Sequence, residues 1–577
     1  MMHHWFKKPK TIVFAALLLT LALAIACGAS APAAPAPSTA TPVANKAPAA
    51  TAVPAAGSSL APAPVVTSTT KRLVVALGPL SEESNAPWLA SPVFDREQLY
   101  ERLIGIERST GELIPQLATK WEMSPDGLDL TFWLRKGVPF HYGWGEFTAR
   151  DVKHMVAMLT QQGSVASESD LYRETTKEVE IINDYQVIFH QQKPNIFSVP
   201  YYNSQDGSSV IMSKAQWDAE GLEGYQRRPV GTGAYRYVSR VPSQSLLAER
   251  AVGHWRKTPE FEELQRLFTK EEATRLAALL AGEAHLVVLP KDLEQAAKSK
   301  GYKVLKSVVP GGQTQWFFGG QYYATPEHLQ PFPWIGQTRE ARLVRQAMNK
   351  AINRQEIITN VYHGDAEPAR VSGFHRTLPG FNPEWDQKWE ELYGYDPKRA
   401  KELLAEAGYP NGFKMTVLLT PTPSVPEASQ IGQILGQYFQ AIGLDATLEQ
   451  MDNATLAKKR RAYQMQGKVY ATSANYRDPQ TTIQKHNSSV EGLSHYYEDN
   501  FIDEKYEALT RAIDPMERDR IERELGDHKF NEFAEIPFLW FAATVAVNSD
   551  VVAEYIYPGN HRAYYSHLEY IKAAKQK

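Results

Sequence analysis

Cysteine is almost absent from this sequence, because Cys27 is the single one among 577 residues. An intrachain disulfide needs two cysteines, so no such bond stabilises the folded chain, whichever compartment it occupies. An excess of either charge is also missing, since 62 Lys and Arg stand against 65 Asp and Glu, for a formal net charge of −3. This near balance gives no electrostatic reason to expect nucleic acid or another polyanion as a partner.

Short catalytic motifs are missing too. The chain contains no His-Glu-x-x-His zinc motif, no Gly-x-Ser-x-Gly nucleophile elbow and no Walker A sequence. His495 precedes Tyr496, Tyr497, Glu498 and Asp499, a group that suggests a metal, but it lacks the glycine of a calcium loop, and an acidic surface is the ordinary interpretation. We predict a protein that is not an enzyme and needs no cofactor or metal. A secreted hydrolase, whose paired carboxylates meet only on folding, is the alternative from another class.

The N-terminus has the pattern of an export signal. Lys7, Lys8 and Lys10 form a basic segment, residues 11–26 are apolar, and Cys27 follows. The combination resembles a lipoprotein signal peptide ending at Cys27, which is acylated and becomes the new N-terminus. An uncleaved transmembrane anchor is the alternative, although about 16 apolar residues are fewer than the ~20 that span a bilayer. Either interpretation places the folded part outside the cytoplasm, in the periplasm or at the cell surface, anchored to the membrane.

Residues 28–70 consist almost wholly of Ala, Pro, Ser, Thr and Val, with Lys46 as their one charged residue. Such a composition cannot build a hydrophobic core and favours an extended chain. We interpret these residues as a tether between the membrane and the folded part.

The rest of the chain is long enough for two or three lobes, and its patterns are those of an α/β protein. Strand-like apolar runs occupy residues 71–77 and 536–547, and a Pro-Asp-Gly turn within residues 121–135 predicts a hairpin. Residues 95–103 have helical spacing. Residues 397–449 alternate between helix and strand patterns, with strands predicted at 414–419 and 445–449 and a helix at 428–441.

Gly231-Thr232-Gly233 invites comparison with a phosphate-binding loop. Such loops follow a strand and open a helix, whereas here residues 234–238 alternate as a strand does. We therefore interpret the two glycines as the tight turn that enters this strand.

Several segments together resemble the extracellular solute-binding protein family 5, the peptide, dipeptide and nickel-binding family that serves ABC importers. The matching segments are residues 117–122, 126–128, 134–141, 147–152, 229–235, 273–287 and 342–357. Because these segments form one ordered series, the resemblance is specific, and it covers the chain from about residue 71 to the end.

The resemblance implies a two-lobed, periplasmic-binding-protein-like (class II) α/β fold with an extra domain inserted in the first lobe. The implied division is 1–27 signal, 28–70 tether, 71–110 first lobe, 111–226 inserted domain, 227–312 first lobe, 313–535 second lobe and 536–577 return to the first lobe. Closure of the lobes buries a small organic solute, an oligopeptide or similar, and the closed monomer docks on the permease subunits of an ABC importer. A receptor that presents its solute to a sensor without transport is the alternative.

Asn475, Tyr476 and Asp478 are expected at the ligand. Peptide-binding members resembling this chain carry an aspartate at the position of Asn475, where it pairs with the ammonium group of the peptide. A neutral amide compensates a buried cation poorly, so standard peptide recognition is in doubt here. Asn475 is equally interpretable as a structural loop amide, whereas for Asp478 the ordinary interpretation is the N-cap of a helix that starts at Pro479.

Three aromatic residues are further ligand candidates. Trp316 lies where the resemblance puts the strand that leaves the first lobe, and Trp88 and Phe94 follow the first strand. Each suits a stacking surface for a sugar, another planar ligand or an apolar peptide side chain, but core packing is the more common role of such residues.

Overall fold

The computed structural model describes residues 71–78, 83–89, 98–166, 169–203, 209–420, 425, 427–475, 479, 482–483, 495–557 and 566–575. All of them belong to one compact unit of the chain. The predicted signal and tether, with Cys27, lie outside the described residues. Of the helices that the described residues form, none combines the length and apolar character needed to span a bilayer.

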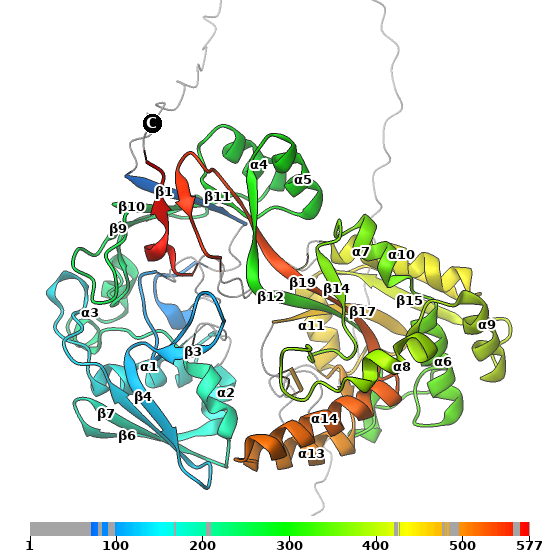
Figure 1. Ribbon diagram of the computed structural model, residues 1–577. Helices are drawn as coiled ribbons and strands as arrows, with labels where there is room; N and C mark the ends of the chain where they lie inside the picture. Colours follow the sequence, from blue (N-terminus) through cyan, green and yellow to red (C-terminus); the bar gives the residue numbers. More distant parts are fainter. Residues whose placement is uncertain are drawn as a thin grey trace, which may run out of the picture. The chain divides into compact units, whose positions relative to one another are not determined.

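The largest sheet has eleven strands and runs from β8 at one end to β16 at the other (Figure 1). Its strands, in spatial order, are β16 (Asp445–Gln450), β15 (Lys414–Leu419), β17 (Lys468–Asn475), β12 (Lys303–Phe318), β19 (Glu535–Val547), β11 (Leu286–Val287), β1 (Arg72–Leu77), β10 (Glu263–Phe268), β9 (Ser245–Arg250) and β8 (Tyr235–Val241), with β14 (Ala366–Pro368) also paired to β19.

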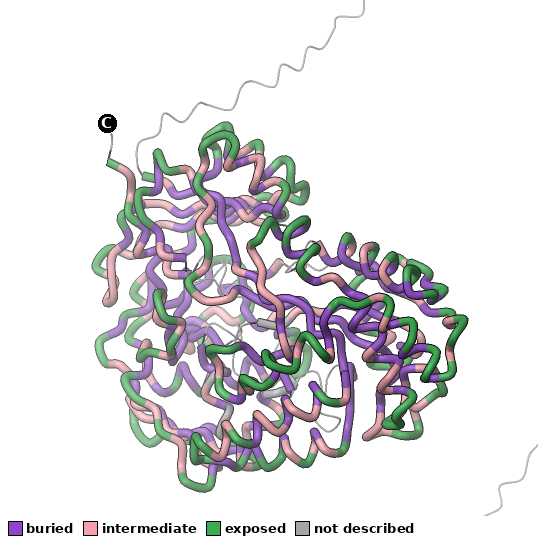
Figure 2. Tube along the Cα trace, turned by 45° about the vertical axis from the view of Figure 1, so that its right-hand side comes forward, coloured by how far each residue is buried: buried purple, intermediate pink, exposed green. Residues whose placement is uncertain are grey.

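Strands β12 and β19 connect two sets of hydrophobic clusters. Val545 of β19 packs with Leu73 in one cluster, whereas Ile536 packs with Trp316 of β12 in another. We call the parts around these clusters lobe 1 (the described residues of 71–306 and 544–575) and lobe 2 (those of 312–541). Residues 311–318 of β12 and nearly all of β19 are buried, whereas residues 303–310 of β12 are exposed or half-buried; Figure 2 colours the chain by burial. The passage of β19 into lobe 1 comes later than the predicted boundary at residue 536, because residues 536–541 still pack in lobe 2.

Lobe 1 holds the parallel strands β1, β10 and β11, with α4 (Glu272–Leu280) and α5 (Lys291–Ser299) beside them. A separate antiparallel sheet has the order β4 (Ala118–Met123), β5 (Asp129–Leu134), β7 (Gln186–Gln191) and β6 (Thr176–Asn183), accompanied by α1 (Ala149–Thr160), α2 (Ser169–Thr175) and α3 (Lys214–Arg227). Phe132 and Phe189 of this sheet belong to the same hydrophobic cluster as Leu73. The second sheet therefore shares its core with lobe 1, and the inserted-domain boundaries 111–226 stay a prediction.

Lobe 2 packs helices around β15, β16 and β17. Its helices are α6 (Arg339–Lys350), α7 (Arg354–Asn360), α8 (Glu384–Tyr393), α9 (Pro397–Glu406), α10 (Ala428–Ala441), α11 (Asn453–Arg461), α13 (Asn500–Arg511) and α14 (Pro515–Asn531). Small strand pairs complete the structure: β2 (Ile104–Ile106) with β3 (Leu113–Pro115), β13 (Gln321–Tyr322) with β18 (Tyr497–Glu498), and β20 (Val552–Glu554) with β21 (Lys572–Ala573). Short 3₁₀ helices lie at Pro87–Leu89, His141–Gly143, Ile196–Tyr202, Pro326–His328 and Leu568–Tyr570.

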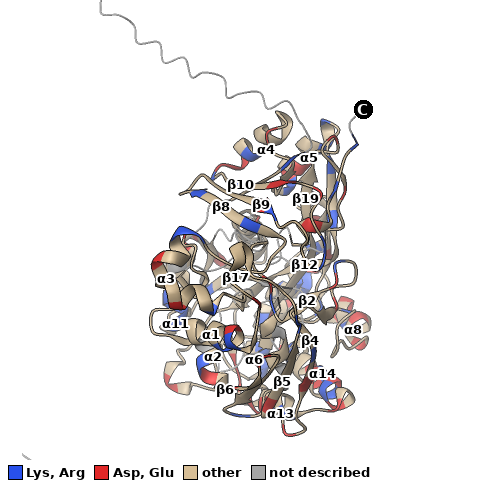
Figure 3. Ribbon diagram, turned by 90° about the vertical axis from the view of Figure 1, so that its left-hand side faces the viewer, with Lys and Arg blue, Asp and Glu red and all other residues tan. Residues whose placement is uncertain are grey.

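The exposed helix faces mix both charges, as the balanced composition predicts (Figure 3). On α14 the ion pairs Arg520–Glu524 and Arg523–Asp519 join residues four apart. Such pairs stabilise a helix by roughly 0.2 to 0.5 kcal/mol each.

Several predicted elements are confirmed nearly to the residue. Strand β15 and helix α10 have the predicted bounds, and β4 and β5 form the predicted hairpin, with Gly127 in its turn at a φ of +69°. The carboxylate of Asp396 accepts a hydrogen bond from the N–H of Arg399, so it caps α9 as predicted. Val344 and Ala347 of α6 face the core of lobe 2.

The predicted helix at residues 95–103 is wrong for its described part. Residues 98–103 are not helical, although every residue from 98 to 106 is buried. The carbonyls of Gln98 and Leu99 accept hydrogen bonds from the N–H groups of Tyr235 and Gly233, both at 3.1 Å. The carbonyl groups of this segment therefore find their hydrogen-bond donors in a segment far away along the chain. The helical spacing of its apolar residues reflects burial alone.

The same pairing explains Gly231 and Gly233 differently from the predicted turn. The strand after them is confirmed as β8, but neither glycine has a positive φ. A Cβ atom would lie 2.1 Å from the Leu99 carbonyl oxygen at Gly231 and 2.2 Å from the Gln98 oxygen at Gly233. Glycine is required here because two backbones approach closely.

Candidate ligand-binding site

The hinge between the lobes is a short irregular segment of β12, residues 307–311. The pairing of β12 with β19 shifts register between Lys306 and Pro310 and again between Pro310 and Gly312. A Cβ at Gly311 would lie 2.4 Å from the nitrogen of Ala543 on β19, so the two strands cross at a distance that only glycine permits. Bulges of this kind re-aim a strand, and here they mark where it leaves one lobe for the other.

The carboxyl ends of parallel strands lie at the crossing of β12 and β19. In lobe 2, β15 pairs in parallel with β17, and the last residue of β17, Asn475, lies opposite Gly312. In lobe 1, β1 pairs in parallel with β10 and β11. Ligands of open α/β sheets bind outside the carboxyl ends of such strands. This rule makes the junction of the lobes the candidate ligand-binding site.

Two buried glutamines lie on β12 directly after the hinge. The Gln315 side-chain amide donates to Gln313 Oε1 at 3.0 Å, and the N–H of Gly373 donates to the same oxygen at 2.8 Å. Both glutamines are 0% exposed. Gln313 Nε2 and Gln315 Oε1 have no hydrogen-bond partner among the described residues. Buried polar atoms left open in this way are places for ordered water or for polar groups of a ligand.

An ion pair supports the polar wall behind these glutamines. Lys529 Nζ lies 3.2 Å from Glu535 Oε1 and donates to the Ser372 carbonyl at 3.0 Å, and the N–H of Ser372 donates to Glu535 Oε1 at 2.9 Å. The side chains of Lys529 and Glu535 are 1% and 2% exposed. The pair fixes α14 and the loop at Ser372 to the start of β19.

A second buried cluster links the two lobes. Lys291 Nζ, at the start of α5, lies 3.2 Å from both Glu294 oxygens and donates to Thr544 Oγ1 at 3.0 Å. The N–H of Lys291 donates to Glu427 Oε1 of lobe 2 at 3.4 Å. Burial raises the pKa of Glu427, and the Glu294 carboxylate adds to that effect while Lys291 opposes it.

The structure places the predicted ligand residues in different surroundings. Asn475 ends β17 at the junction, although its side chain is not described. Tyr476, Asp478 and Phe94 lie outside the described residues, as does Cys27. Whether any of them contacts a ligand stays a prediction.

The two predicted tryptophans are described and lie in hydrophobic cores. Trp316 is 0% exposed, with its ring centroid 6.3 Å from that of Phe538 in lobe 2. Trp88 is 3% exposed, and its ring lies 5.5 Å from Trp217 and 5.4 Å from Tyr225 in lobe 1. These surroundings are those of the core interpretation, and a ligand role for either ring stays a prediction.

Sequence reasoning missed Gln313, Gln315 and the Lys291–Glu427 contact. The one sequence signal was a run of three polar residues, Gln313, Thr314 and Gln315, directly before the apolar Trp316. Glu427 and Thr544, two of the partners of Lys291, lie more than a hundred residues away along the chain. At His495, the imidazole pairs with the buried carboxylate of Glu498, and the described residues contain no group of three or more potential metal ligands.

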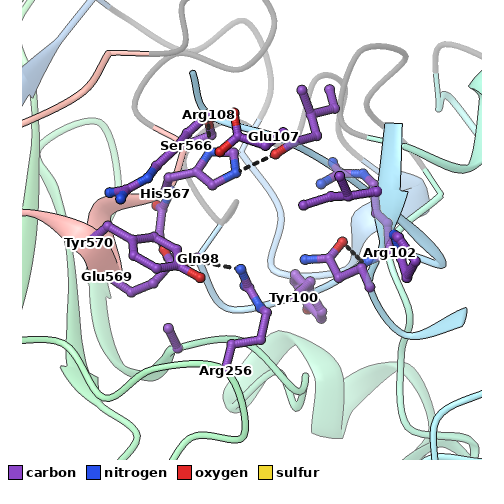
Figure 4. Close-up of a pocket in the computed structure, with 16 residues that line it drawn as sticks. Gln98, Tyr100, Arg102, Glu107, Arg108, Arg256, Ser566, His567, Glu569 and Tyr570 are labelled. Carbon is purple, nitrogen blue, oxygen red and sulfur yellow. Dashed lines mark hydrogen bonds and ion pairs between the residues drawn. The ribbon is translucent and has the colours of Figure 1, made fainter. Parts of the chain in front are cut away.

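Lobe 1 also contains a cavity of about 310 Å³ (Figure 4). It is lined by the β2–β3 hairpin, by residues before β2, by Ala234 and Arg256, and by residues 566–570 near the C-terminus. None of the predicted ligand residues lines it, and all of its lining residues belong to lobe 1.

Residues 112–493, more than half of the chain, match the family described as bacterial extracellular solute-binding proteins, family 5. Among curated proteins, the chain is 26% identical over 408 residues to heme-binding protein A of Haemophilus influenzae, covering 66% of this chain and 70% of that protein. It is 29% identical over 377 residues to the glutathione-binding protein GsiB of Pectobacterium atrosepticum, covering 64% and 66%. The chain thus spans about two thirds of the length of these two relatives.

Solved structures show the same fold. The periplasmic binding protein DppA of Helicobacter pylori, in complex with the peptide STSA, superposes with a TM-score of 0.68 at 24% identity, over 87% of this chain and 98% of that one. NikA of Brucella suis, in complex with Fe(III)-EDTA, gives 0.70 at 18% identity, over 87% and 99%. The expectation of a two-lobed α/β binding-protein fold is confirmed. The relatives are binding proteins, which confirms the prediction that this chain is not an enzyme, and the chain belongs to family 5 of the bacterial extracellular solute-binding proteins.

Proposed function

We propose that this protein is the membrane-anchored, extracytoplasmic solute-binding component of an ABC importer. It captures a small organic solute, an oligopeptide or a similar molecule, between its two lobes and delivers it to the permease. The observation that carries this proposal is the junction itself, where β12 and β19 cross between two cores beside the carboxyl ends of parallel strands. Solute-binding proteins of this type close around their ligand by a hinge motion.

The proposed site includes Asn475 at the end of β17 and the open amide groups of Gln313 and Gln315. These groups are neutral, and they suit hydrogen bonds to amides, hydroxyls or carboxylates of a solute. The contact between Lys291 and Glu427 is a further link between the lobes.

Native mass spectrometry of the protein purified without added ligand tests the binding role. We expect a single small molecule retained per chain, and the Gln313→Leu variant retains less of it. Chemical turnover of the retained molecule, in place of stoichiometric release, would falsify the binding-protein function. Uptake assays on cells that lack the gene distinguish transport, which is then lost, from presentation to a sensor, which leaves uptake unchanged.

The lipid anchor has a separate test in Cys27→Ser. If Cys27 is acylated, the variant leaves the membrane fraction and becomes extractable without detergent. If the variant remains in the membrane, the apolar residues 11–26 act as an uncleaved anchor and the lipoprotein assignment is wrong.

A further inference from the structure

We propose that the lobe 1 cavity is a second ligand site, separate from the junction, for a small zwitterion that carries a carboxylate and an ammonium group. Its volume of about 310 Å³ is at the lower end of the roughly 300 to 1,000 Å³ typical of small-molecule sites. The proposal does not depend on the solute that binds between the lobes.

The inner wall of the cavity is a fixed ionic network. Arg256 Nε donates to Glu101 Oε1 and Arg256 Nη1 donates to Glu569 Oε1, both at 2.8 Å. Burial by itself raises the pKa of Glu101, but the Arg256 guanidinium and the hydrogen bonds from His254 and Trp255 lower it to about 2. Glu101 is therefore ionised at every physiological pH, and Arg256 is held in one orientation.

Two polar groups of this network have no hydrogen-bond partner among the described residues. Arg256 Nη2 and Glu569 Oε2 make no hydrogen bond with the described residues. In Figure 4, Arg256 points toward the middle of the cavity. The wall therefore offers a hydrogen-bond donor and a carboxylate oxygen from an otherwise rigid network.

Arg108 supplies a further cation. Its guanidinium lies over the Tyr570 ring at 4.6 Å, and it makes no ion pair with a described carboxylate within 4.0 Å. The ring of His567, beside it, bonds to the Ile106 carbonyl at 2.8 Å and to Ser566 Oγ at 2.8 Å, so both of its nitrogens are engaged. Arg108 is thus the ionic group of this rim that is available to an anion.

The charges identify the ligand class. Arg102, Arg108 and Arg256 line the cavity together with Glu107 and Glu569, and Glu101, which does not line it, pairs with Arg256, so the surroundings are close to neutral but carry separated charges of both signs. A ligand with one charge leaves the opposite group of the wall uncompensated, which is costly in a partly desolvated site. A small zwitterion complements both, with its carboxylate toward Arg108 and Arg256 and its ammonium toward Glu569.

Isothermal titration of the purified full chain with leucine, 4-methylpentanoate and 3-methylbutylamine tests this, because the three probes share one side chain. We expect leucine to bind at least about tenfold more tightly than either singly charged probe, since a hydrogen bond to a charged group contributes that much. Equal binding of 4-methylpentanoate and leucine, or no binding of leucine, overturns the proposal.

Two variants locate the binding. Arg108→Gln removes the rim cation, and Ile114→Trp fills the cavity from a position that is 37% exposed and so tolerates a larger side chain. Both are expected to weaken leucine binding at least about tenfold, whereas Arg520→Gln on α14 leaves it unchanged. Native mass spectrometry of the same variants should still show the molecule retained at the junction. Leucine binding that survives both cavity variants refutes the site without bearing on the proposed transport function.

Discussion

The ion pair between Lys529 and Glu535 gives a quantitative test of how lobe 2 is held together. Replacing Lys529 with methionine keeps the apolar stem of the side chain but removes the ammonium group. Glu535 is then left with a carboxylate that is 2% exposed, with its second oxygen already unpartnered among the described residues. Breaking a buried pair from one side costs roughly 3 to 5 kcal/mol, because the remaining charge has no compensation.

A matched control exists in an ion pair that joins α13 to the same helix. Lys505 Nζ lies 2.8 Å from Glu524 on α14, but these side chains are 25% and 34% exposed. Lys505→Met removes the same chemical group at a shorter distance, and a solvent-screened pair of this kind contributes only about 0 to 1 kcal/mol. The comparison therefore isolates burial as the cause of the difference.

Equilibrium unfolding in urea at pH 7, followed by circular dichroism, measures both variants. We expect Lys529→Met to lower the unfolding free energy by about 3 kcal/mol or more, and Lys505→Met by less than about 1 kcal/mol. Adding Glu535→Gln to Lys529→Met should recover much of the loss, because a neutral amide still accepts from the N–H of Ser372. A loss at Lys529 no larger than that at Lys505, or no recovery in the double variant, would refute the reasoning.

Other predictions concern the hinge, the junction and acid stability. Gly311→Ala places a Cβ 2.4 Å from the Ala543 nitrogen, so it should lower the melting temperature and change the rate of ligand release, and unchanged values would contradict the crossing geometry. Asn475→Asp should raise the affinity for trialanine by about tenfold but not that for its N-acetylated form, as calorimetry can measure, and an equal response of both peptides would exclude a role for the ammonium group. Glu427→Gln should remove the pH dependence of ligand retention. Because burial raises the pKa of Glu427, closure of the lobes is favoured at low pH and weakens as the pH rises through that pKa. An unaltered pH profile in the variant would refute the coupling between Glu427 protonation and closure. Burial lowers the pKa of His285 to about 4, so its contribution to stability is present above pH 6.5 and is lost between pH 6.5 and 4, at about 1.4 kcal/mol per pH unit. His285→Gln should flatten the plot of unfolding free energy against pH over this range. Equal slopes in the variant and the unchanged protein would contradict the lowered pKa of His285.

Local sequence signals were sufficient to predict many of the helices and strands. Asp396 followed by Pro397 fixes the start of α9, because an aspartate oxygen satisfies a free N–H at a helix terminus and proline suits the first turn. The bounds of β15 and α10 followed from periodicity and from the turns between them. The ordered series of family segments determined the two-lobed architecture and the class of binding protein.

The tertiary structure decided what depends on residues far apart in the chain. The segment at residues 98–103 has the spacing of a helix, yet its carbonyls pair with Gly233 and Tyr235, and no local pattern predicts that preference. Glu101, Arg256 and Glu569 look like ordinary surface charges in the sequence, but the fold buries both glutamates and pairs them with Arg256 at a cavity. Periodicity and capping depend on neighbours within a few residues, so the sequence alone determines them. The burial of a charge and the crossing of β12 with β19 depend on which distant segments pack together, and only the folded chain establishes that.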